Sequence, residues 1–345
     1  MEKSYIVHYC DIYIEKSEVQ LLKKLLLIIS TIIAALSAFT IFTPYPASWF
    51  TRMLFKGGVA VQPNNYDSIA SKVSQQTDIL YDSAFKSNTL DIISPTNAQE
   101  KLPVIIWVHG GAFVAGDKSD ITEYAVQIAA QGYHVVNMNY ELAPSAKYPT
   151  PLLQLQEVFT FVQKNAEQCG FDMNNVFFAG DSAGAQIVAQ FANIQTDNQY
   201  ASLIGIEQSV PAHNIRGLLL YCGPYDISKL HQMSDNRVIA FLLKRVGWGY
   251  LGEQNWQTSD IAKEASPIDY VTTNFPPSFI TDGTVITFDD HGKALVERLE
   301  QLNVDVTSKF YEDVELPHEF QFMMDRPEAQ EILELTLDFI QQKRK

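Results

Sequence analysis

The chain has 345 residues, 46% of them hydrophobic and 12% aromatic, so it can bury a substantial core as one large domain or two modest ones. Its 25 lysines and arginines are outnumbered by 40 aspartates and glutamates, which gives a formal net charge of -15. A surface this acidic repels phosphate backbones and argues against nucleic acid as a partner. The three cysteines (Cys10, Cys169 and Cys222) show no metal-type spacing and no disulfide framework, although a single Cys169–Cys222 bridge stays open for an exported domain.

Near the N-terminus, residues 25–42 (LLLIISTIIAALSAFTIF) carry no charge and directly follow Lys23 and Lys24. Eighteen apolar residues lie at the short end of what spans a bilayer, where about 20 are usual. The positive-inside rule places the two lysines in the cytoplasm. We therefore expect a short cytoplasmic segment at 1–22, a single-pass anchor at 23–43, and the rest of the chain outside the cytoplasm.

Two other interpretations of this apolar segment stay open. A cleaved signal peptide could use Ala35-Leu36-Ser37 as its cleavage site, but more than twenty residues that include Glu15 and Glu18 make a poor leading region. A buried helix would need an amphipathic pattern, and the segment has none. The membrane anchor is the interpretation that the sequence favours.

A short helix is predicted after the apolar segment. Pro44 and Pro46 break the first helix, and ASWFTRMLFKGG (47–58) reads as an amphipathic helix that ends at a glycine pair. We assign residues 44–74 to a linker or cap segment and residues 75–345 to one globular domain.

Apolar strands alternate with helical segments through this domain. Long helices are expected over 119–132, 151–170 and 182–195. The expected strands cover 77–82, 89–94, 102–109, 133–140, 174–180, 215–223, 276–282 and 307–313, and the first two should pair as antiparallel strands. This alternation predicts an α/β fold with a mostly parallel central sheet flanked by helices, in which ligands bind beyond the C-terminal ends of the strands.

The pentapeptide Gly-Asp-Ser-Ala-Gly (180–184) follows one such strand and opens a helix. A nucleophile elbow needs a sharp strand-to-helix turn, and small flanking residues let the backbone fold that tightly. The helix N-terminus behind Ser182 offers free N–H groups to developing negative charge. A glycine-rich packing turn is the alternative, but this context favours Ser182 as a nucleophile.

A second glycine-rich loop, His-Gly-Gly-Ala-Phe (109–113), follows the strand over 102–109. Adjacent glycines let backbone N–H groups approach a ligand closely. Together with the N–H of the residue after the nucleophile, such a loop can form an oxyanion hole for a tetrahedral intermediate.

The general base should be a histidine after the last strand, and His318 in ELPHEFQF has that position. His291 is the nearest rival, but it stands at the start of a helix, where an exposed surface residue is the plainer expectation. The acid should stand near the end of the penultimate strand, which favours Asp282 and leaves Asp289 and Asp290 as alternatives. His318 begins no zinc motif, because a second histidine four residues on is missing.

These motifs together resemble a known family. HGGAF, NYELAPSAKYPTPL, GDSAG and LPHEF, in this order, resemble the hormone-sensitive-lipase-like branch of the α/β-hydrolases over about residues 75–345. The resemblance implies an α/β-hydrolase fold and a serine carboxylic ester hydrolase without cofactor or metal. It assigns Ser182 as nucleophile and His318 as base. It also assigns the oxyanion hole to the N–H groups of Gly111, Ala112 and Ala183, with Gly110 shaping the turn.

The chain departs from the family pattern at two places. Ala112 replaces the usual third glycine, which matters only if the backbone there needs a positive φ. The acid segment reads DGTVITFDD where the family usually has Asp-Pro-Leu-x-Asp. Asp181, which is diagnostic of the branch, is expected to brace the elbow through hydrogen bonds.

Residues 226–275 are too long for a simple connection between two core strands and predict a helical cap. Phe241, Trp248 and Tyr250 are candidates for lining the acyl or alcohol pocket, with ordinary core packing as the alternative.

The sequence leaves the substrate partly open. The expected partner is a small or medium-chain ester, while the physiological ester and the oligomeric state are unassigned. An amide or peptide hydrolase and a non-catalytic binding protein on the same scaffold are the alternative functions.

Overall fold

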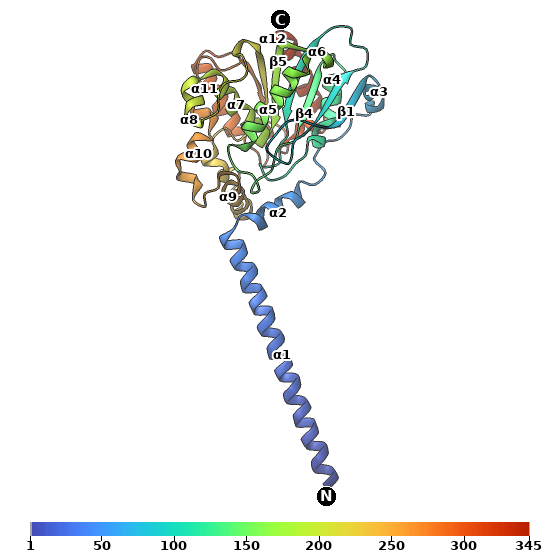
Figure 1. The fold of residues 1–345 in the computed structure, drawn as a ribbon, viewed down its shortest axis with the longest axis vertical. Helices are drawn as coiled ribbons and strands as arrows, with labels where there is room; N and C mark the ends of the chain where they lie inside the picture. Colours follow the sequence, from blue (N-terminus) through green and yellow to red (C-terminus); the bar gives the residue numbers. More distant parts are fainter. Residues whose placement is uncertain (1, 345) are drawn as a thin grey trace. The chain divides into compact units, whose positions relative to one another are not determined.

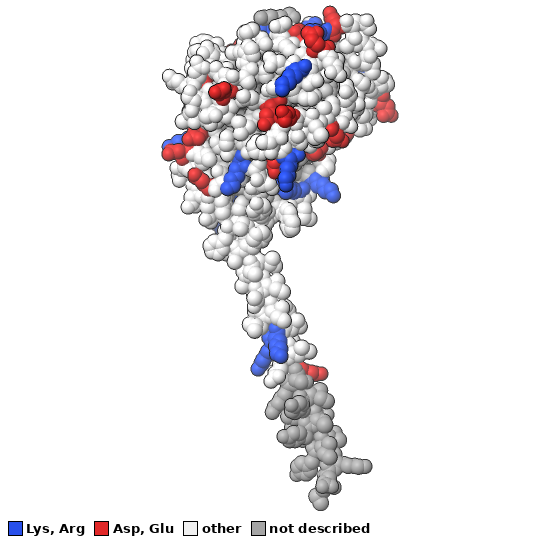
Figure 2. Space-filling view, in the orientation of Figure 1, with Lys and Arg blue, Asp and Glu red and all other residues white. Residues whose placement is uncertain are grey.

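The computed structural model describes the backbone of residues 2–344 and the side chains of residues 18–344. The chain divides into two compact units, the second of which begins at Ser48. The first unit contains helix α1 (Glu2–Phe42), whose part Glu18–Phe42 is long and apolar enough to cross a membrane. Lys23 and Lys24 precede its apolar stretch, which is drawn in Figure 2 without red or blue atoms. At 1.5 Å per residue these 25 residues rise about 37 Å, which exceeds the ~30 Å hydrocarbon core.

Helix α2 (Tyr45–Leu54) follows and is shorter than the predicted 47–58. Pro46 is accommodated because it lies in the first turn, where no backbone N–H is needed. Arg52 on α2 donates through Nε to the Val114 carbonyl at 2.6 Å and through Nη2 to the Ala143 carbonyl at 3.0 Å. The part of α2 from Ser48 onward is thus held within the second unit, and a short helix α3 (Tyr66–Ala70) follows it.

The second unit contains one eight-stranded sheet in the order β1-β2-β4-β3-β5-β6-β7-β8 (Figure 1). Strands β1 and β2 pair antiparallel, as predicted, and β2 pairs antiparallel with β4, while the pairs from β4 through β8 are parallel. The strand bounds are Val73–Leu80, Thr89–Pro95, Leu102–Val108, His134–Met138, Phe171–Asp181, Ile215–Tyr221, Ser278–Thr281 and Val306–Lys309 for β1 to β8. All eight predicted strands are thus confirmed, with shifted ends.

Both faces of the central strands are buried, which explains their continuous apolar sequences. In β3, Ile106 packs into a core with α5 (Thr150–Lys164) and α7 (Ala183–Thr196). Its neighbour Trp107 faces a second core with α4 (Thr122–Ala129) and α12 (Pro327–Lys343). Successive side chains of a strand point to opposite faces, so an apolar run with two covered faces has no polar alternation. The remaining helices of the sheet layers are α6 (Ala166–Cys169), α8 (Asn198–Ile204) and α11 (Asp289–Gln301).

The cap predicted over 226–275 is built of short helices between β6 and β7. They are η3 (Ile227–Gln232), α9 (Arg237–Leu251), η4 (Trp256–Thr258), α10 (Asp260–Glu264) and η5 (Pro267–Asp269). Shorter 3₁₀ turns elsewhere are η1 (Lys118–Ile121), η2 (Ala212–Asn214) and η6 (Phe320–Phe322). Cys169 and Cys222 are free thiols in this structure, so the disulfide left open by the sequence is not formed here.

Candidate active site

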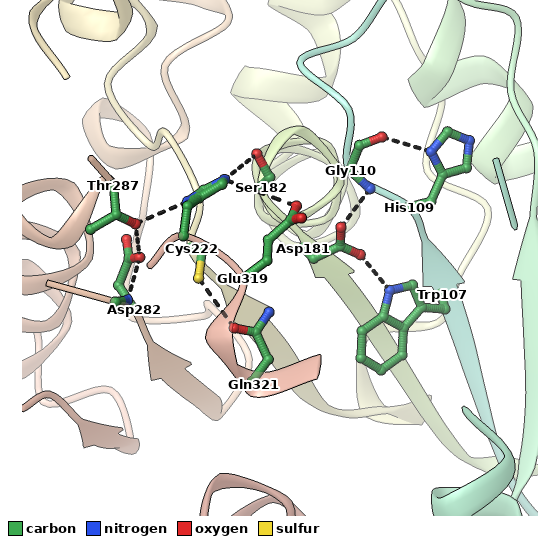
Figure 3. A network of polar contacts seen from close by, with 12 residues as sticks. Trp107, His109, Gly110, Asp181, Ser182, Cys222, Asp282, Thr287, Glu319 and Gln321 are labelled. Carbon is green, nitrogen blue, oxygen red and sulfur yellow. Dashed lines mark hydrogen bonds and ion pairs between the residues drawn. The ribbon is translucent and has the colours of Figure 1, made fainter. Parts of the chain in front are cut away.

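Ser182 stands between the last residue of β5 and the first residue of α7, at the C-terminal edge of the sheet (Figure 3). Its backbone has φ 51° and ψ -118°, an uncommon conformation for a residue other than glycine. A Cβ on Gly184 would lie 1.9 Å from the Val108 carbonyl oxygen, and one on Gly180 would lie 2.4 Å from the Gly184 carbonyl carbon. Only glycines permit this packing, so the Gly-x-Ser-x-Gly spacing has a steric cause and produces an elbow.

His318 lies in the loop between β8 and η6, and its Nε2 is 2.9 Å from Ser182 Oγ. The structure thus brings together two predicted residues that are far apart in the sequence. Burial lowers the pKa of His318 to about 4, so the imidazole is neutral near pH 7. A neutral imidazole at this distance can accept the serine proton.

Asp282 follows β7 directly and is 1% exposed. Its Oδ1 accepts hydrogen bonds from the Gly283 N–H at 2.7 Å and from the Thr287 hydroxyl, and Thr287 Oγ1 lies 2.9 Å from His318 Nδ1. The predicted acid therefore reaches the histidine through a hydroxyl that sequence reasoning missed. Burial raises the pKa of Asp282 to about 7, although its hydrogen bonds act in the opposite direction.

The two alternative acids occupy the first turn of α11. Asp289 pairs with Lys293 at 2.8 Å, four residues further along the helix. His291, in the same turn, is not the exposed residue that we expected. Its Nδ1 accepts the Asp226 N–H at 3.2 Å, and burial lowers its pKa to about 4. The predicted exposure of His291 was wrong because its position at the start of a helix does not show that the cap loop covers the side chain.

The loop that follows β3 presents candidate oxyanion donors beside Ser182. Among the described residues, the N–H groups of Gly111, Ala112 and Ala183 donate no hydrogen bond, whereas the Gly110 N–H is held by Asp181 Oδ2 at 2.7 Å. Gly110 can therefore shape the loop but cannot donate to a substrate. Ala112 has φ 54°, so the position where the family has glycine does need the left-handed conformation here.

Asp181 and Glu319 form a buried carboxyl pair beneath this loop. Asp181 accepts the Trp107 indole N–H at 2.8 Å as well as the Gly110 N–H, so it braces the loop onto the elbow. Glu319 Oε1 lies 3.9 Å from His318 Nε2. Burial raises the pKa of Glu319 well above its usual range, and the charge of Asp181 raises it further. Both carboxyls of the pair are thus shifted toward their protonated forms. The only feature of the sequence that pointed to Glu319 as a site residue was its position next to His318.

A small apolar cavity of about 50 Å³ opens beside Ser182 and His318. The cap contributes Leu243 and Val246 of α9 to its wall, and not the aromatic residues that we considered. Tyr250 is buried in a stack on Phe113 with ring centroids 3.8 Å apart, and Phe241 and Trp248 contact the Arg245 guanidinium. The cavity is lined by Phe55, Ala112, Phe113, Ser182, Ala183, Pro224, Leu230, Met233, Leu243, Val246, Phe288 and His318.

One group of side chains near the site has the composition of a metal site. A sulfur of Cys222, a carboxylate oxygen of Asp282 and a ring nitrogen of His318 lie within 4.8 Å of one another. The Thr287 hydroxyl already contacts both Asp282 and His318, so an ion would have to displace it. The hydrogen-bonded arrangement accounts for these groups without a metal.

Substitution should lower the esterase activity at Gly111 but leave it intact at the neighbouring residue Ala112. Gly111 has φ 105°, and a Cβ there would lie 2.2 Å from the Ala115 carbonyl oxygen, so Gly111→Ala should displace the loop. Loss of one oxyanion donor costs on the order of 10²–10³ in kcat. Ala112→Gly relieves about 1 kcal/mol of left-handed strain and should retain activity. Steady-state hydrolysis of p-nitrophenyl acetate compares both variants, and equal activities would contradict this account of the loop.

The buried carboxyl pair should make the fold less stable as the pH rises. Because the pKa of Glu319 is raised in the folded state, the folded chain binds more protons than the unfolded chain. The free energy of unfolding is therefore highest below about pH 4.5 and falls as the pH rises toward the folded pKa of Glu319. The free energy of unfolding falls by about 1.4 kcal/mol for each pH unit over which Glu319 is protonated in the folded chain and ionised in the unfolded chain. Glu319→Gln should flatten the decline in urea unfolding between pH 5 and 8. Glu207→Gln, at an exposed carboxyl, is the control, and equal slopes in both variants would refute the pairing.

Comparisons with known proteins agree with this architecture. A model of the BD-FAE family matches residues 90–289, which is more than half of the chain. Esterase LipC of Mycobacterium tuberculosis is 30% identical over 207 residues, which cover 58% of this chain and 49% of LipC. Esterase LipQ of the same organism is 27% identical over 213 residues, which cover 61% of this chain and 48% of LipQ. The chain thus spans about half the length of these curated relatives.

Solved structures share the fold at low sequence identity. Esterase B from Lactobacillus rhamnosis superimposes with a TM-score of 0.67 at 23% identity, covering 82% of this chain and 90% of that chain. A bacterial heroin esterase gives 0.65 at 20% identity, with coverages of 80% and 86%. At these identities the likeness establishes the fold alone. Together with the family match and the motif order, it places the chain in the BD-FAE family, within the esterase branch of the α/β-hydrolases.

Proposed function

We propose that this chain is a serine carboxylic ester hydrolase that works through an acyl-enzyme. One observation carries the proposal, namely the 2.9 Å contact between Ser182 Oγ and His318 Nε2 at a strained strand-to-helix turn. A serine and a neutral imidazole in this arrangement are the activated nucleophile of acyl transfer. The names of the relatives LipC and LipQ, both esterases, point the same way.

In the proposed first step, His318 Nε2 removes the Ser182 proton while Oγ attacks the ester carbonyl carbon. The negative charge that forms on the carbonyl oxygen is held by N–H groups of the Gly111-Ala112 loop and of Ala183. The protonated imidazole then transfers its proton to the departing alcohol, and the acyl group stays on Ser182. In the second step His318 activates a water in the same way, and the acid leaves with the enzyme restored.

We assign the acid of the triad to Asp282 in preference to Asp289 or Asp290. Asp282 is buried behind His318, on the side of Nδ1, and is linked to that nitrogen through one hydroxyl. Asp289 is engaged by Lys293 instead. The apolar cavity beside Ser182 suits the acyl group of a small or medium-chain ester, because its wall offers hydrocarbon contacts and few polar groups.

Ser182→Ala should lower kcat for p-nitrophenyl acetate by on the order of 10⁶, since it removes the nucleophile. The same substitution should abolish labelling by a fluorophosphonate probe. Matched ester and amide substrates test the alternative of an amide hydrolase. A variant that still hydrolyses the ester at the parent rate would refute the mechanism, and a parent chain that neither hydrolyses nor reacts with the probe would point to a binding protein.

We also propose that residues 23–43 anchor the chain in a membrane with the catalytic domain outside the cytoplasm. Support comes from the apolar part of α1, Glu18–Phe42, and from Lys23 and Lys24 at its start. In intact cells, external protease should then digest the globular unit, and alkaline washing should leave the full-length chain in the membrane fraction. Protection of the domain until lysis would reverse the orientation, and a shorter soluble chain would indicate a cleaved signal.

A further inference from the structure

The carboxylate of Asp282 and the imidazole of His318 are joined by a third side chain. The Thr287 hydroxyl donates to Asp282 Oδ1, and the same oxygen lies 2.9 Å from His318 Nδ1 (Figure 3). Thr287 is 7% exposed, so little water competes for these contacts. The Gly283 N–H holds Asp282 Oδ1 from the backbone at 2.7 Å.

The single proton of a hydroxyl gives this chain of contacts a direction. When Thr287 donates to an ionised Asp282, its oxygen can only accept, so the hydrogen between Thr287 and His318 must belong to Nδ1. The neutral imidazole then carries its lone pair on Nε2, the nitrogen that faces Ser182. That tautomer is the one that can take the serine proton.

We propose that Thr287 is a positioning residue of the reaction, whose hydroxyl links the carboxylate of Asp282 to His318 Nδ1 and fixes the reactive tautomer. The proposal rests on the ester hydrolase function proposed above. No proton travels along this link. When His318 takes the Ser182 proton on Nε2, the Nδ1 proton stays in place and the polarised hydroxyl stabilises the imidazolium.

The loop that carries Thr287 is built to hold it at this place. Leu316, two residues before His318, accepts the N–H groups of Thr284 and Val285 at 2.8 and 3.0 Å, so the two loops form one hydrogen-bonded unit. Ile286, directly before Thr287, has φ 49° and is 52% exposed. A β-branched residue in this conformation is strained and packs little, and such strain persists where the surrounding structure requires it.

Other titratable groups also face this link. Cys222 lies beside Asp282 and His318, Glu319 faces the opposite ring nitrogen, and the charge of Asp289 acts on Asp282 from the first turn of α11. The Thr287 oxygen is in hydrogen-bond contact with both Asp282 Oδ1 and His318 Nδ1. The protonation of Asp282 is therefore expected to act on the histidine through Thr287.

The test compares Thr287→Val, which keeps the side-chain shape without the hydroxyl, with Thr287→Ser, which keeps the hydroxyl. Both are made in the full chain in detergent and assayed with p-nitrophenyl acetate. Thr287→Val should lower kcat by about 10² or more with KM changed less than about threefold, because a wrong tautomer in a comparable triad costs about 10⁴. Thr287→Ser should recover kcat to within about tenfold of the parent. Thermal unfolding of each variant checks that the fold is intact.

A double variant separates a linked residue from an independent one. If Asp282 acts through Thr287, Thr287→Val with Asp282→Asn should lose no more kcat than the worse single variant, since residues that act as a unit are strongly non-additive. Asp338→Asn, at an exposed position on α12, is the matched control and should leave kcat unchanged. Losses that multiply in the double variant would overturn the proposal.

The pH profile gives a readout that a purely structural role would not change. Burial raises the pKa of Asp282 to about 7, and a neutral carboxyl would no longer hold the hydroxyl as its donor by charge, so the reactive tautomer would lose its preference. In the parent chain kcat/KM should therefore fall as the pH drops through about 7, and Thr287→Val should lack this limb. If Thr287→Val keeps the parent kcat and pH limb while Ser182→Ala is inactive, this inference fails and the proposed function stands. If the parent chain itself is inactive toward esters, the proposed function fails first.

Discussion

The close approach of α7 to the end of β3 is the constraint on which the site depends. A Cβ at Gly184 would overlap the Val108 carbonyl, so the helix can begin here only because the residue is glycine. The turn that results forces Ser182 into its strained backbone conformation and leaves the first N–H of α7, that of Ala183, without an intrahelical partner. Since β3 continues into the Gly110 loop, the same contact brings the candidate oxyanion donors alongside the nucleophile.

Burial of acidic groups is the second organising feature of the site. Asp181 braces the loop from below, Glu319 lies against it, and Asp282 stands behind His318, and the pKa of each of these carboxyls is raised with burial as the largest cause. Buried carboxylates are costly unless they are hydrogen-bonded. Asp181 accepts an indole N–H and a backbone N–H, and Asp282 accepts a backbone N–H and a hydroxyl.

The sequence predicted those parts of the site that periodicity and strand-end position govern. Ser182 and Asp282 follow predicted strands, which the structure contains. Thr287 and Glu319 lie in loops where Ile286 and Glu319 adopt positive φ. No pattern of residue types reports such loop conformations. Of the two interpretations of the cap aromatics, core packing holds for Tyr250, and none of the three lines the cavity. Leu243, Val246 and Tyr250 recur on the buried face of α9, whereas Phe241, Arg245 and Trp248 share another face and contact one another.

The segment that follows the apolar helix in sequence is also part of the site. Arg52 fixes α2 to the carbonyls of Val114 and Ala143, and Val114 in turn donates its N–H to the Gly111 carbonyl within the candidate oxyanion loop. Phe55, just after α2, forms part of the cavity wall beside Ser182. Because Nε and Nη2 of Arg52 both donate to buried carbonyls, α2 has little freedom to move independently of the Gly111 loop. Residues well before the first strand therefore contact the candidate site, through Arg52 at the loop and Phe55 at the cavity wall.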